Sequence, residues 1–323
     1  MYNIYVEYYP VESRGIDIER AVYINGKIPF YGADAVTFSR VWADNGEIQK
    51  DNRGNDIRPT QVEKPIWQSS YVKDYMGYHV DPYKFYFEKG VNTLKFEGVN
   101  EPFIIRKVQI CNKAEEPSYA DYINSIDKAK YDNSGDTESI VVQGEASVRR
   151  SSPSLYPNND RASAITDPYS PTLILMNKIG GSQWKVAGDW IEWDINVPKD
   201  GLYTLSVKGR QNRGFVSSRS VSIDGECPFD ECNIISFQFD NDWQMLTLGD
   251  EEGNPYQFAL TAGTHTIRYY QCDPNMALIR MTVYEDSLAN VYNSPAESYY
   301  VGKEVNTDAR ISDKNTMYSR IGD

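Results

Sequence analysis

One stretch of this chain occurs twice, and the duplication constrains the fold more than any other feature. Residues 20–30 read Arg-Ala-Val-Tyr-Ile-Asn-Gly-Lys-Ile-Pro-Phe, and residues 219–229 read Arg-Ser-Val-Ser-Ile-Asp-Gly-Glu-Cys-Pro-Phe. Trp67-Gln68 returns as Trp243-Gln244, and Gly90 returns as Gly263. The spacing between matches drifts in small steps, as expected when loops change length between two copies of one fold. The sequence therefore predicts two related domains.

The two copies differ at their beginnings. The second copy has the stretch from Ser139 to Asp200 ahead of Gly201-Leu202-Tyr203. Met1-Tyr2 already stands where Leu202-Tyr203 stands, so the first copy lacks a counterpart of that stretch. We therefore expect the chain to begin inside its first domain.

Short strand patterns dominate both copies and predict an all-β protein. Asn25-Gly26 and Asp224-Gly225 occupy equivalent places and favour type I′ hairpin turns. Many short strands without helix-sized gaps between them favour two antiparallel β-sandwich domains of jelly-roll type. The expected strands are residues 2–9, 21–24, 84–87 and 93–96 in the first copy, and 189–195, 202–207, 234–239, 244–248, 256–260, 264–270 and 277–284 in the second.

The pattern also predicts the domain order. An incomplete sandwich covers residues 1–112, a short helical linker 113–138, a complete sandwich 139–286, and a polar tail or linker 287–323. In the linker, Tyr119, Tyr122, Ile123 and Ile126 have helical spacing, and Ser118 is a candidate N-cap. In the complete sandwich, the alternation across residues 189–195 predicts that Ile191, Trp193 and Ile195 face the core.

Composition excludes some classes of function. The net charge of −13 and pI near 4.8 argue against nucleic-acid binding, which needs clustered Lys and Arg. No run of about 18 apolar residues exists, so no membrane span is expected. Cys227 and Cys232 enclose a loop that a disulfide could close, and whether they are bridged stays open.

Motifs of catalysis are absent from the sequence. No nucleophile elbow, phosphate-binding loop or dinucleotide fingerprint occurs, and the two His residues have unrelated contexts. Glycoside hydrolysis needs only two suitably spaced carboxylates, and Asp189, Glu192 and Asp194 are the cluster to consider. We expect no enzyme activity, with a glycoside hydrolase fragment as an alternative.

The second copy resembles a known family through five motifs in order: residues 188–193 (Gly-Asp-Trp-Ile-Glu-Trp), 197–205 (Val-Pro-Lys-Asp-Gly-Leu-Tyr-Thr-Leu), 242–244 (Asp-Trp-Gln), 262–268 (Ala-Gly-Thr-His-Thr-Ile-Arg) and 275–280 (Asn-Met-Ala-Leu-Ile-Arg). These residues are similar to carbohydrate-binding modules of families 6 and 35. The resemblance implies a galactose-binding-like β-sandwich that binds a polysaccharide or oligosaccharide without catalysis.

The resemblance also implies a binding site. By motif position, the two aromatic rings that flank a sugar are Trp184 and Trp243, and the hydrogen-bonding amide is Asn275. A pyranose has apolar faces and polar edges, so flat rings and polar side chains suit it. Tyr156 and Arg161, in a neighbouring loop-like stretch, are further candidates. A structural role stays open for each of these residues. For Trp243 the reason is its counterpart Trp67 in the first copy.

A structural calcium ion is common in these families. Glu145 with Asp286 or Glu285 supplies the hard oxygen ligands that Ca²⁺ needs, although Gln143 replaces one acid of the family motif. In the first copy Glu101 stands where Asn275 stands, and a counterpart of Trp184 is missing. Sugar binding by the first copy is therefore in doubt.

The paired arrangement is also similar to modules attached to extracellular solute-binding proteins of gut Firmicutes carbohydrate importers. That similarity rests on residues 20–30 and on Asp-Asn-Arg-Gly-Asn-Asp-Ile-Arg-Pro at 51–59. It implies an extracellular or cell-surface location and a solute-binding domain as a partner in a longer chain. The alternative to glycan binding is a pair of structural spacer sandwiches, which predicts an apolar patch where the first copy lacks strands.

Overall fold

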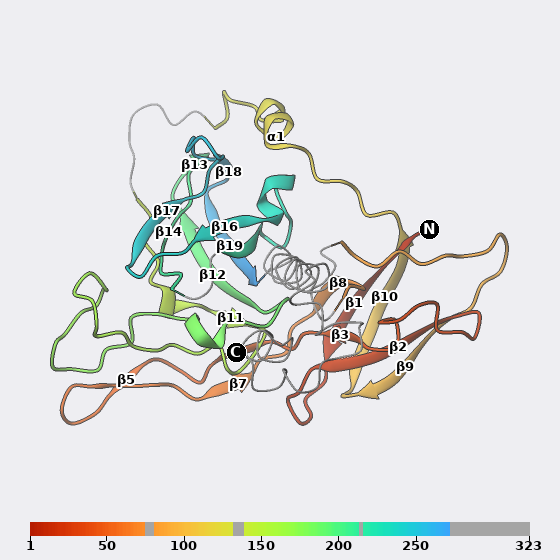
Figure 1. Ribbon diagram of the computed structural model, residues 1–323, viewed down its shortest axis with the longest axis horizontal. Helices are drawn as coiled ribbons and strands as arrows, with labels where there is room; N and C mark the ends of the chain where they lie inside the picture. Colours follow the sequence, from red (N-terminus) through yellow and green to blue (C-terminus); the bar gives the residue numbers. More distant parts are fainter. Residues whose placement is uncertain (75–80, 132–138, 213–215, 272–323) are drawn as a thin grey trace, which may run out of the picture. The chain divides into compact units, whose positions relative to one another are not determined.

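The computed structural model describes residues 1–74, 81–131, 139–212 and 216–271. Antiparallel strands account for almost all regular structure in these ranges, so the predicted all-β sandwich class is confirmed (Figure 1). Among the described residues, no helix has both the length and the apolar character needed to cross a membrane.

The first copy forms a sandwich of two three-stranded sheets. One sheet has the order β10-β1-β8 and the other β3-β2-β9. Alternate residues of β1 and β2 point between the sheets, so Ile4, Val6 and Val22 are fully buried in its core. The strands of this half are β1 (Asn3–Pro10), β2 (Ile18–Ile24), β3 (Val36–Phe38), β4 (Trp42–Asp44), β5 (Gln49–Lys50), β6 (Asp56–Ile57), β7 (Gln61–Glu63), β8 (Gln68–Tyr71), β9 (Leu94–Asn100) and β10 (Phe103–Cys111).

The second copy repeats this plan with a wider sheet. The order β16-β15-β19-β12-β11-β4-β7 faces two ribbons, β13-β18 and β14-β17. Phe229 and Phe258 are fully buried in its core. Its strands are β11 (Arg149–Arg150), β12 (Trp190–Val197), β13 (Gly201–Tyr203), β14 (Ser206–Gly209), β15 (Val216–Ile223), β16 (Ile235–Gln238), β17 (Gln244–Thr247), β18 (Phe258–Leu260) and β19 (Gly263–Gln271), with 3₁₀ turns η1 (Gly144–Ala146), η2 (Gly181–Gln183) and η3 (Asp230–Asn233).

Local predictions are confirmed where they rest on turn and cap chemistry. Asn25 and Asp224 both adopt positive φ, of 50° and 53°, as type I′ turns require. Helix α1 (Tyr119–Ser125) begins after Ser118, whose side chain accepts a hydrogen bond from the N–H of Asp121. The expected strand 84–87 is reduced to one bridge between Phe85 and Tyr2, because β8 occupies that edge of β1 further along.

Strands from the first copy extend the sheet of the second. Trp42 on β4 pairs with Arg150 on β11, and β7 continues the sheet beyond β4. The Arg150 guanidinium is fully buried and donates to both carboxylate oxygens of Asp44 at 3.0 and 2.9 Å. It also donates to Gln61 Oε1 at 2.9 Å. The insertion between residues 31 and 65 is therefore bonded into the second sandwich, and the predicted boundary near residue 138 stays a prediction.

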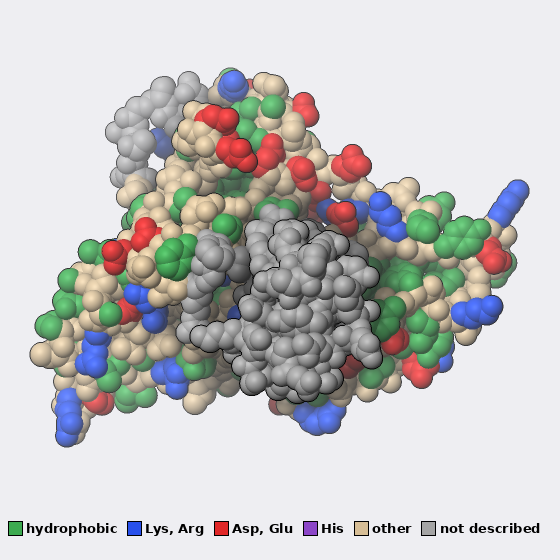
Figure 2. All heavy atoms as spheres, viewed as in Figure 1, with side chains coloured by type: hydrophobic (Ala, Val, Ile, Leu, Met, Phe, Trp, Pro, Cys, Tyr) green, Lys and Arg blue, Asp and Glu red, His purple; other side chains and the backbone are tan. Residues whose placement is uncertain are grey.

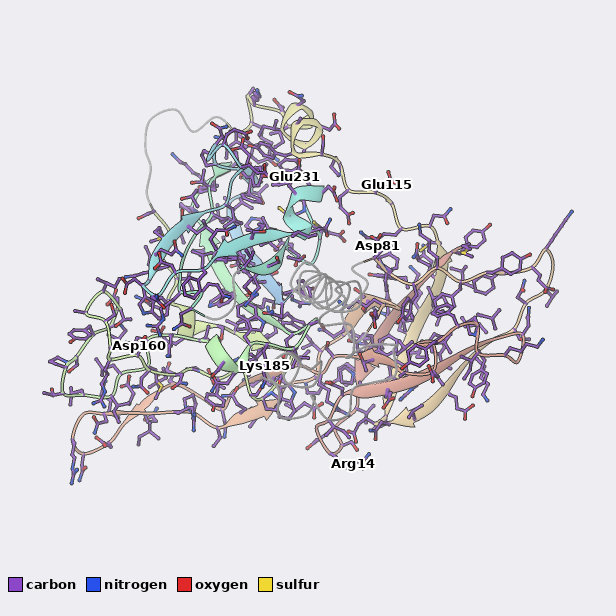
Figure 3. The ribbon with its side chains drawn as sticks, viewed as in Figure 1. Arg14, Asp81, Glu115, Asp160, Lys185 and Glu231 are labelled. Carbon is purple, nitrogen blue, oxygen red and sulfur yellow. The ribbon has the colours of Figure 1, made fainter. Side chains whose placement is uncertain are left out.

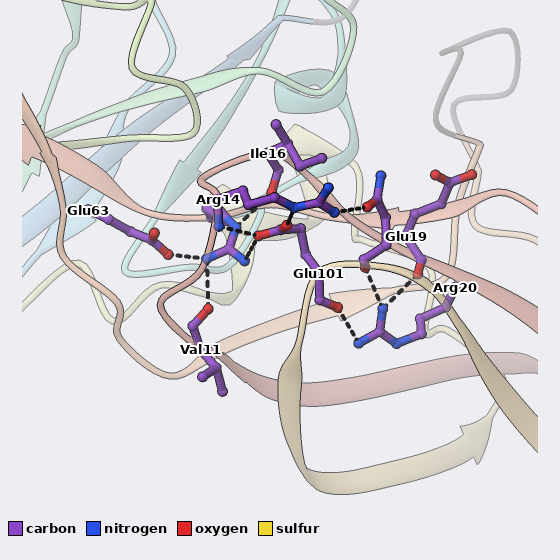
Figure 4. A network of polar contacts seen from close by, with 9 residues as sticks. Val11, Arg14, Ile16, Glu19, Arg20, Glu63 and Glu101 are labelled. Carbon is purple, nitrogen blue, oxygen red and sulfur yellow. Dashed lines mark hydrogen bonds and ion pairs between the residues drawn. The ribbon is translucent and has the colours of Figure 1, made fainter.

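A buried ion-pair network closes one end of the first sandwich (Figure 4). The Arg40 side chain, 1% exposed, donates to Glu101 Oε2 at 2.7 Å and pairs with Glu63. Arg14 donates to the other Glu101 oxygen at 2.9 Å. Arg20 donates to the carbonyl oxygen of Glu101 at 2.8 Å. Both carboxylates of the network face a guanidinium, whereas Arg20 donates its hydrogen bonds to backbone carbonyl oxygens.

Candidate functional site

A small groove opens between the β14–β17 ribbon and β16 in the second sandwich. Its floor is apolar, and three carboxamide side chains stand around it. Gln244 shares a strand face with Leu246, whereas Gln238 follows Phe237 on β16 and points to the opposite face of that strand. The lining residues are Gly209, Gln211, Phe237, Gln238, Gln244 and Leu246. Such a combination of apolar surface and a few placed polar groups is typical of small-molecule sites.

Trp243 lies immediately before the groove residue Gln244. Its indole N–H donates to Asp160 Oδ2 at 3.2 Å, and the Arg210 guanidinium lies 5.2 Å from the ring centroid. Arg210 also pairs with Asp160 at 2.9 Å. Burial opposes ionisation of Asp160, but the Ala162 N–H and the Arg210 charge outweigh it and lower the pKa of Asp160. The ring is therefore held in place by its edge and by one face.

Hydrogen bonds to Asn177 hold the loop that carries Asp160, which is labelled in Figure 3. The Asp160 N–H donates to Asn177 Oδ1 at 2.7 Å, and Asn177 Nδ2 donates back to the Asp160 carbonyl at 2.9 Å. Asn177 Nδ2 also reaches the Pro168 carbonyl at 2.8 Å. Arg161 follows Asp160 and is exposed. Arg161 is therefore the sequence neighbour of Asp160, the residue that anchors Trp243.

Tyr156, in the same loop, is covered by the first copy. The Arg58 guanidinium lies 4.0 Å from the Tyr156 ring centroid, a cation–π contact. The β5–β6 hairpin is bonded to the loop, because Asp56 N–H donates to the Ile174 carbonyl and Met176 N–H donates to Asp56 Oδ2, both at 2.8 Å. Sequence reasoning missed Arg58, since nothing in the pattern predicts contact across the two copies.

Trp184 has an internal environment. Its indole N–H donates to the Asp189 carbonyl at 3.1 Å, and its ring packs against the core of the second sandwich. The Arg219 guanidinium lies 4.4 Å from the ring centroid. A Cβ at Gly180, where φ is +83°, would come within 3.0 Å of the ring. These contacts share no residue with those of Trp243, so contact of Trp184 with a ligand stays a prediction.

The structure describes Trp193 and both cysteines that the sequence singled out. Trp193 faces the core as predicted, and its indole N–H donates to the Gly144 carbonyl at 2.9 Å. Cys227 and Cys232 are free thiols, and Cys227 Sγ donates to the Phe229 carbonyl at 3.2 Å. Asn275 lies outside the described residues.

The expected calcium ligands are only partly visible. Glu145 is half-buried, and its Oε2 is buried without a hydrogen-bond partner. Burial raises the pKa of Glu145 to about 7, and the Asp167 and Asp56 carboxylates add to the rise. Asp286, Glu285 and the rest of residues 272–323 lie outside the described part. Within that part, no three carboxylate, His or Cys side chains gather as metal ligands, so calcium stays a prediction.

Two of the three carboxylates considered for catalysis, Glu192 and Asp194, form ion pairs. Glu192, 4% exposed, pairs with Arg149 and with Arg268 Nη2 at 2.6 Å. Asp194 pairs with Arg149 at 3.1 Å. Asp189 accepts a hydrogen bond from the Ser151 hydroxyl at 2.7 Å, and burial raises its pKa to about 6. The two strand carboxylates share one arginine and point to a structural use.

No family model matches the chain, and no curated protein matches it. Among solved structures it is similar to a cycloisomaltooligosaccharide glucanotransferase of Paenibacillus sp. (24% identity, 48% of this chain, 21% of that one, TM-score 0.29). It is also similar to a family 35 carbohydrate-binding module from an environmental isolate (15%, 42%, 82%, 0.27) and to an isomalto-dextranase of Arthrobacter globiformis T6 (15%, 29%, 15%, 0.21). The chain spans about a fifth of the glucanotransferase. At these TM-scores the overlays assign no function.

Proposed function

We infer that the second sandwich binds a glycan, without catalysis, in the groove beside Trp243. The observation that carries this function is the groove itself, where Phe237 and Leu246 form an apolar floor and Gln244 lies on the same strand face as Leu246. A sugar ring rests its C–H face on such a floor, and glutamine side chains both donate to and accept from its hydroxyls. Trp243, held by Asp160 and Arg210, supplies a further flat surface at the rim.

Calorimetric titration of the full chain tests this function, with a panel of plant, host and uronic-acid glycans. The variants Gln244→Ala and Trp243→Ala are expected to lose binding of any glycan that the unmodified chain binds. Trp67→Ala is the matched control, because Trp67 is the counterpart of Trp243 in the first copy and is 43% exposed. Unchanged affinity in Gln244→Ala and Trp243→Ala contradicts this site, and no binding across the panel contradicts the function.

We also place a structural calcium ion at Glu145 within this proposal. The unpartnered Oε2 of Glu145 supports it, because a buried carboxylate oxygen without a donor suits a hard cation. Calcium is expected to raise the Tm of the full chain and not that of Glu145→Gln. An equal rise in Tm in both proteins would show that calcium binds at a site other than Glu145.

The wider context proposed is an extracellular or cell-surface protein. A structural role, packing on a solute-binding domain of a longer chain, is the second candidate. It is favoured by one observation, the exposure of Ile105, Val108 and Ile110 on the first sandwich. A flat response in every titration of the folded chain favours this role over glycan binding.

A further inference from the structure

The first sandwich has an open side formed by β9 and β10. Among the described residues, β9 pairs only with β2, and β10 pairs only with β1. In the second sandwich the strand equivalent to β9 is β19, and β12 pairs along its other edge from Trp190–Tyr270 to Val197–Gly263. The same edge is therefore covered in one copy and uncovered in the other.

The open side exposes residues that belong to the core face. Across the β1–β10 register, Ile4, Val6 and Tyr8 lie opposite the core-facing residues of β10. These β1 residues are 0 to 2% exposed, whereas their partners on β10 are 38 to 45% exposed. Opposed residues share a face of the sheet, so the β10 residues point inward, and no strand in the described part of the chain covers them. They are Ile105, Val108 and Ile110.

Neither edge is short or interrupted by proline, although each of the two strands contains one β-bulge and carries charged side chains. Edge strands are commonly short or interrupted by proline, and β9 and β10 have seven and nine residues without proline. Hydrophobic side chains also gather over the first sandwich in the right half of Figure 2. Such an edge is a template for another strand.

We propose that β9 pairs antiparallel with β9 of a second copy of this chain, about a two-fold axis at Phe96. This pairing joins the β3-β2-β9 sheets of the two copies into one continuous sheet. It places the inward residues of β10 from both copies on the same side of that sheet, where they cover one another. The contact is isologous and closes as a dimer. This interface is independent of the glycan groove.

Charge selects the register. The outer side of β9 carries Lys95 and Glu97, which are exposed and form an ion pair with each other within the chain. With the axis at Phe96, Lys95 of each copy lies directly opposite Glu97 of the other, so two opposite-charge pairs form. With the axis at either neighbour, Lys95 or Glu97 faces itself. Sliding by one residue would also turn a core face toward water.

Sedimentation of the full chain across micromolar concentrations tests the dimer. The unmodified chain is expected to sediment as a dimer, and Lys95→Glu or Glu97→Lys alone is expected to weaken association about tenfold, because each variant turns two attractive pairs into repulsive ones. A mixture of the two variants is expected to restore the dimer, because every pair is again of opposite charge. Lys27→Glu, at the exposed hairpin turn, is the control for net charge.

The mixing experiment separates pairing from folding, because both variants must be folded to rescue one another. A chain that stays monomeric at all concentrations overturns the proposal and leaves the edge to a strand of another protein or domain. A dimer that is indifferent to both variants also overturns it. Rescue by mixing, without rescue by mixing either variant with Lys27→Glu, is the supporting result.

Discussion

The two sandwiches share a strand plan but differ in how it is completed. The order β3-β2-β9 of the first copy matches β16-β15-β19 of the second, where β12 and β11 continue the sheet. The β12 residues Trp193 and Val197 face the core there, whereas Val108 of the first copy is 38% exposed. Among the described strands, the central strands therefore correspond between the two sandwiches and the edge strands differ.

Two arginines at equivalent positions, Arg20 and Arg219, make similar contacts in the two copies. Arg20 and Arg219 each donate to the carbonyl of the preceding residue, at 2.6 and 2.8 Å. Each guanidinium also lies over an aromatic ring, Phe103 at 4.1 Å for Arg20 and Trp184 at 4.4 Å for Arg219. Trp184 therefore has in the second copy the contact that Phe103 has in the first. The position of Trp184 alone therefore does not distinguish a ring that contacts a ligand from a ring that packs inside the sandwich.

The largest expected effect comes from the paired phenylalanines Phe30 and Phe229. Phe229→Ala is expected to lower the free energy of unfolding by about 4 kcal/mol, because the ring is fully buried and its loss leaves a cavity. Phe30→Ala, at a half-buried position, is expected to cost about half as much. Denaturant unfolding measures both, and equal losses would contradict the difference in packing. The rings in contact are Tyr119, Tyr122, Tyr256 and Phe258 for Phe229, and Tyr83 and Phe85 for Phe30.

The next effect concerns the ion-pair network of the first copy. Arg40→Met is expected to cost about 3 kcal/mol, because Glu63 loses its ion pair and the buried Glu101 keeps only the exposed Arg14 as a partner. Arg14→Ala is the matched control at a side chain that is 69% exposed, and it is expected to cost less than about 1 kcal/mol. Thermal unfolding compares the two variants. Similar losses would mean that Glu101 is compensated by solvent.

A smaller effect is expected where α1 attaches to the second copy. The Tyr119 hydroxyl accepts a hydrogen bond from the Gln257 N–H at 3.0 Å, and the Tyr122 hydroxyl accepts one from the Ala259 N–H at 2.9 Å. Tyr119→Phe and Tyr122→Phe are each expected to cost about 1 kcal/mol in the second sandwich. Amide hydrogen exchange should show the loss near Gln257 and Ala259, and exchange that rises instead in the first sandwich would contradict this attachment.

The smallest effect is the pH dependence that Asp189 contributes; the first copy has no counterpart of this residue, and Glu145, whose pKa burial also raises, contributes separately with the same sign. Its pKa in the fold, about 6, lies above the ordinary value of 3.8 because of burial. The folded state therefore binds the proton more tightly, so stability falls as pH rises from about 3.8 through 6. Asp189→Asn is expected to flatten that slope while keeping the acceptor for Ser151. A slope that is unchanged would assign it to another group.

The groove shows why only part of the site was predictable. Trp243 is a candidate from the sequence because its motif is local, and it stays a prediction, whereas the Asp224-Gly225 turn and the Ser118 cap, which are also local, are confirmed. Asp160 and Arg58 were not found, because their contacts with Trp243 and Tyr156 join distant residues. Nothing in a single sequence records such long-range contacts. Phe237 and Gln238 gave only an alternation, which also fits an ordinary edge strand.

The sequence by itself determined the duplication, the all-β class, the turns and the core face of β12, because these depend on local periodicity and on the backbone needs of individual residues. Only the tertiary structure decided that β4 and β7 extend the sheet of the second copy, that Trp184 packs inward, and that β9 and β10 each have one neighbour among the described strands. Those outcomes depend on which strands meet across the chain. The hydrogen bonds of a strand edge are identical for every partner, so the pattern of one strand does not name its neighbour.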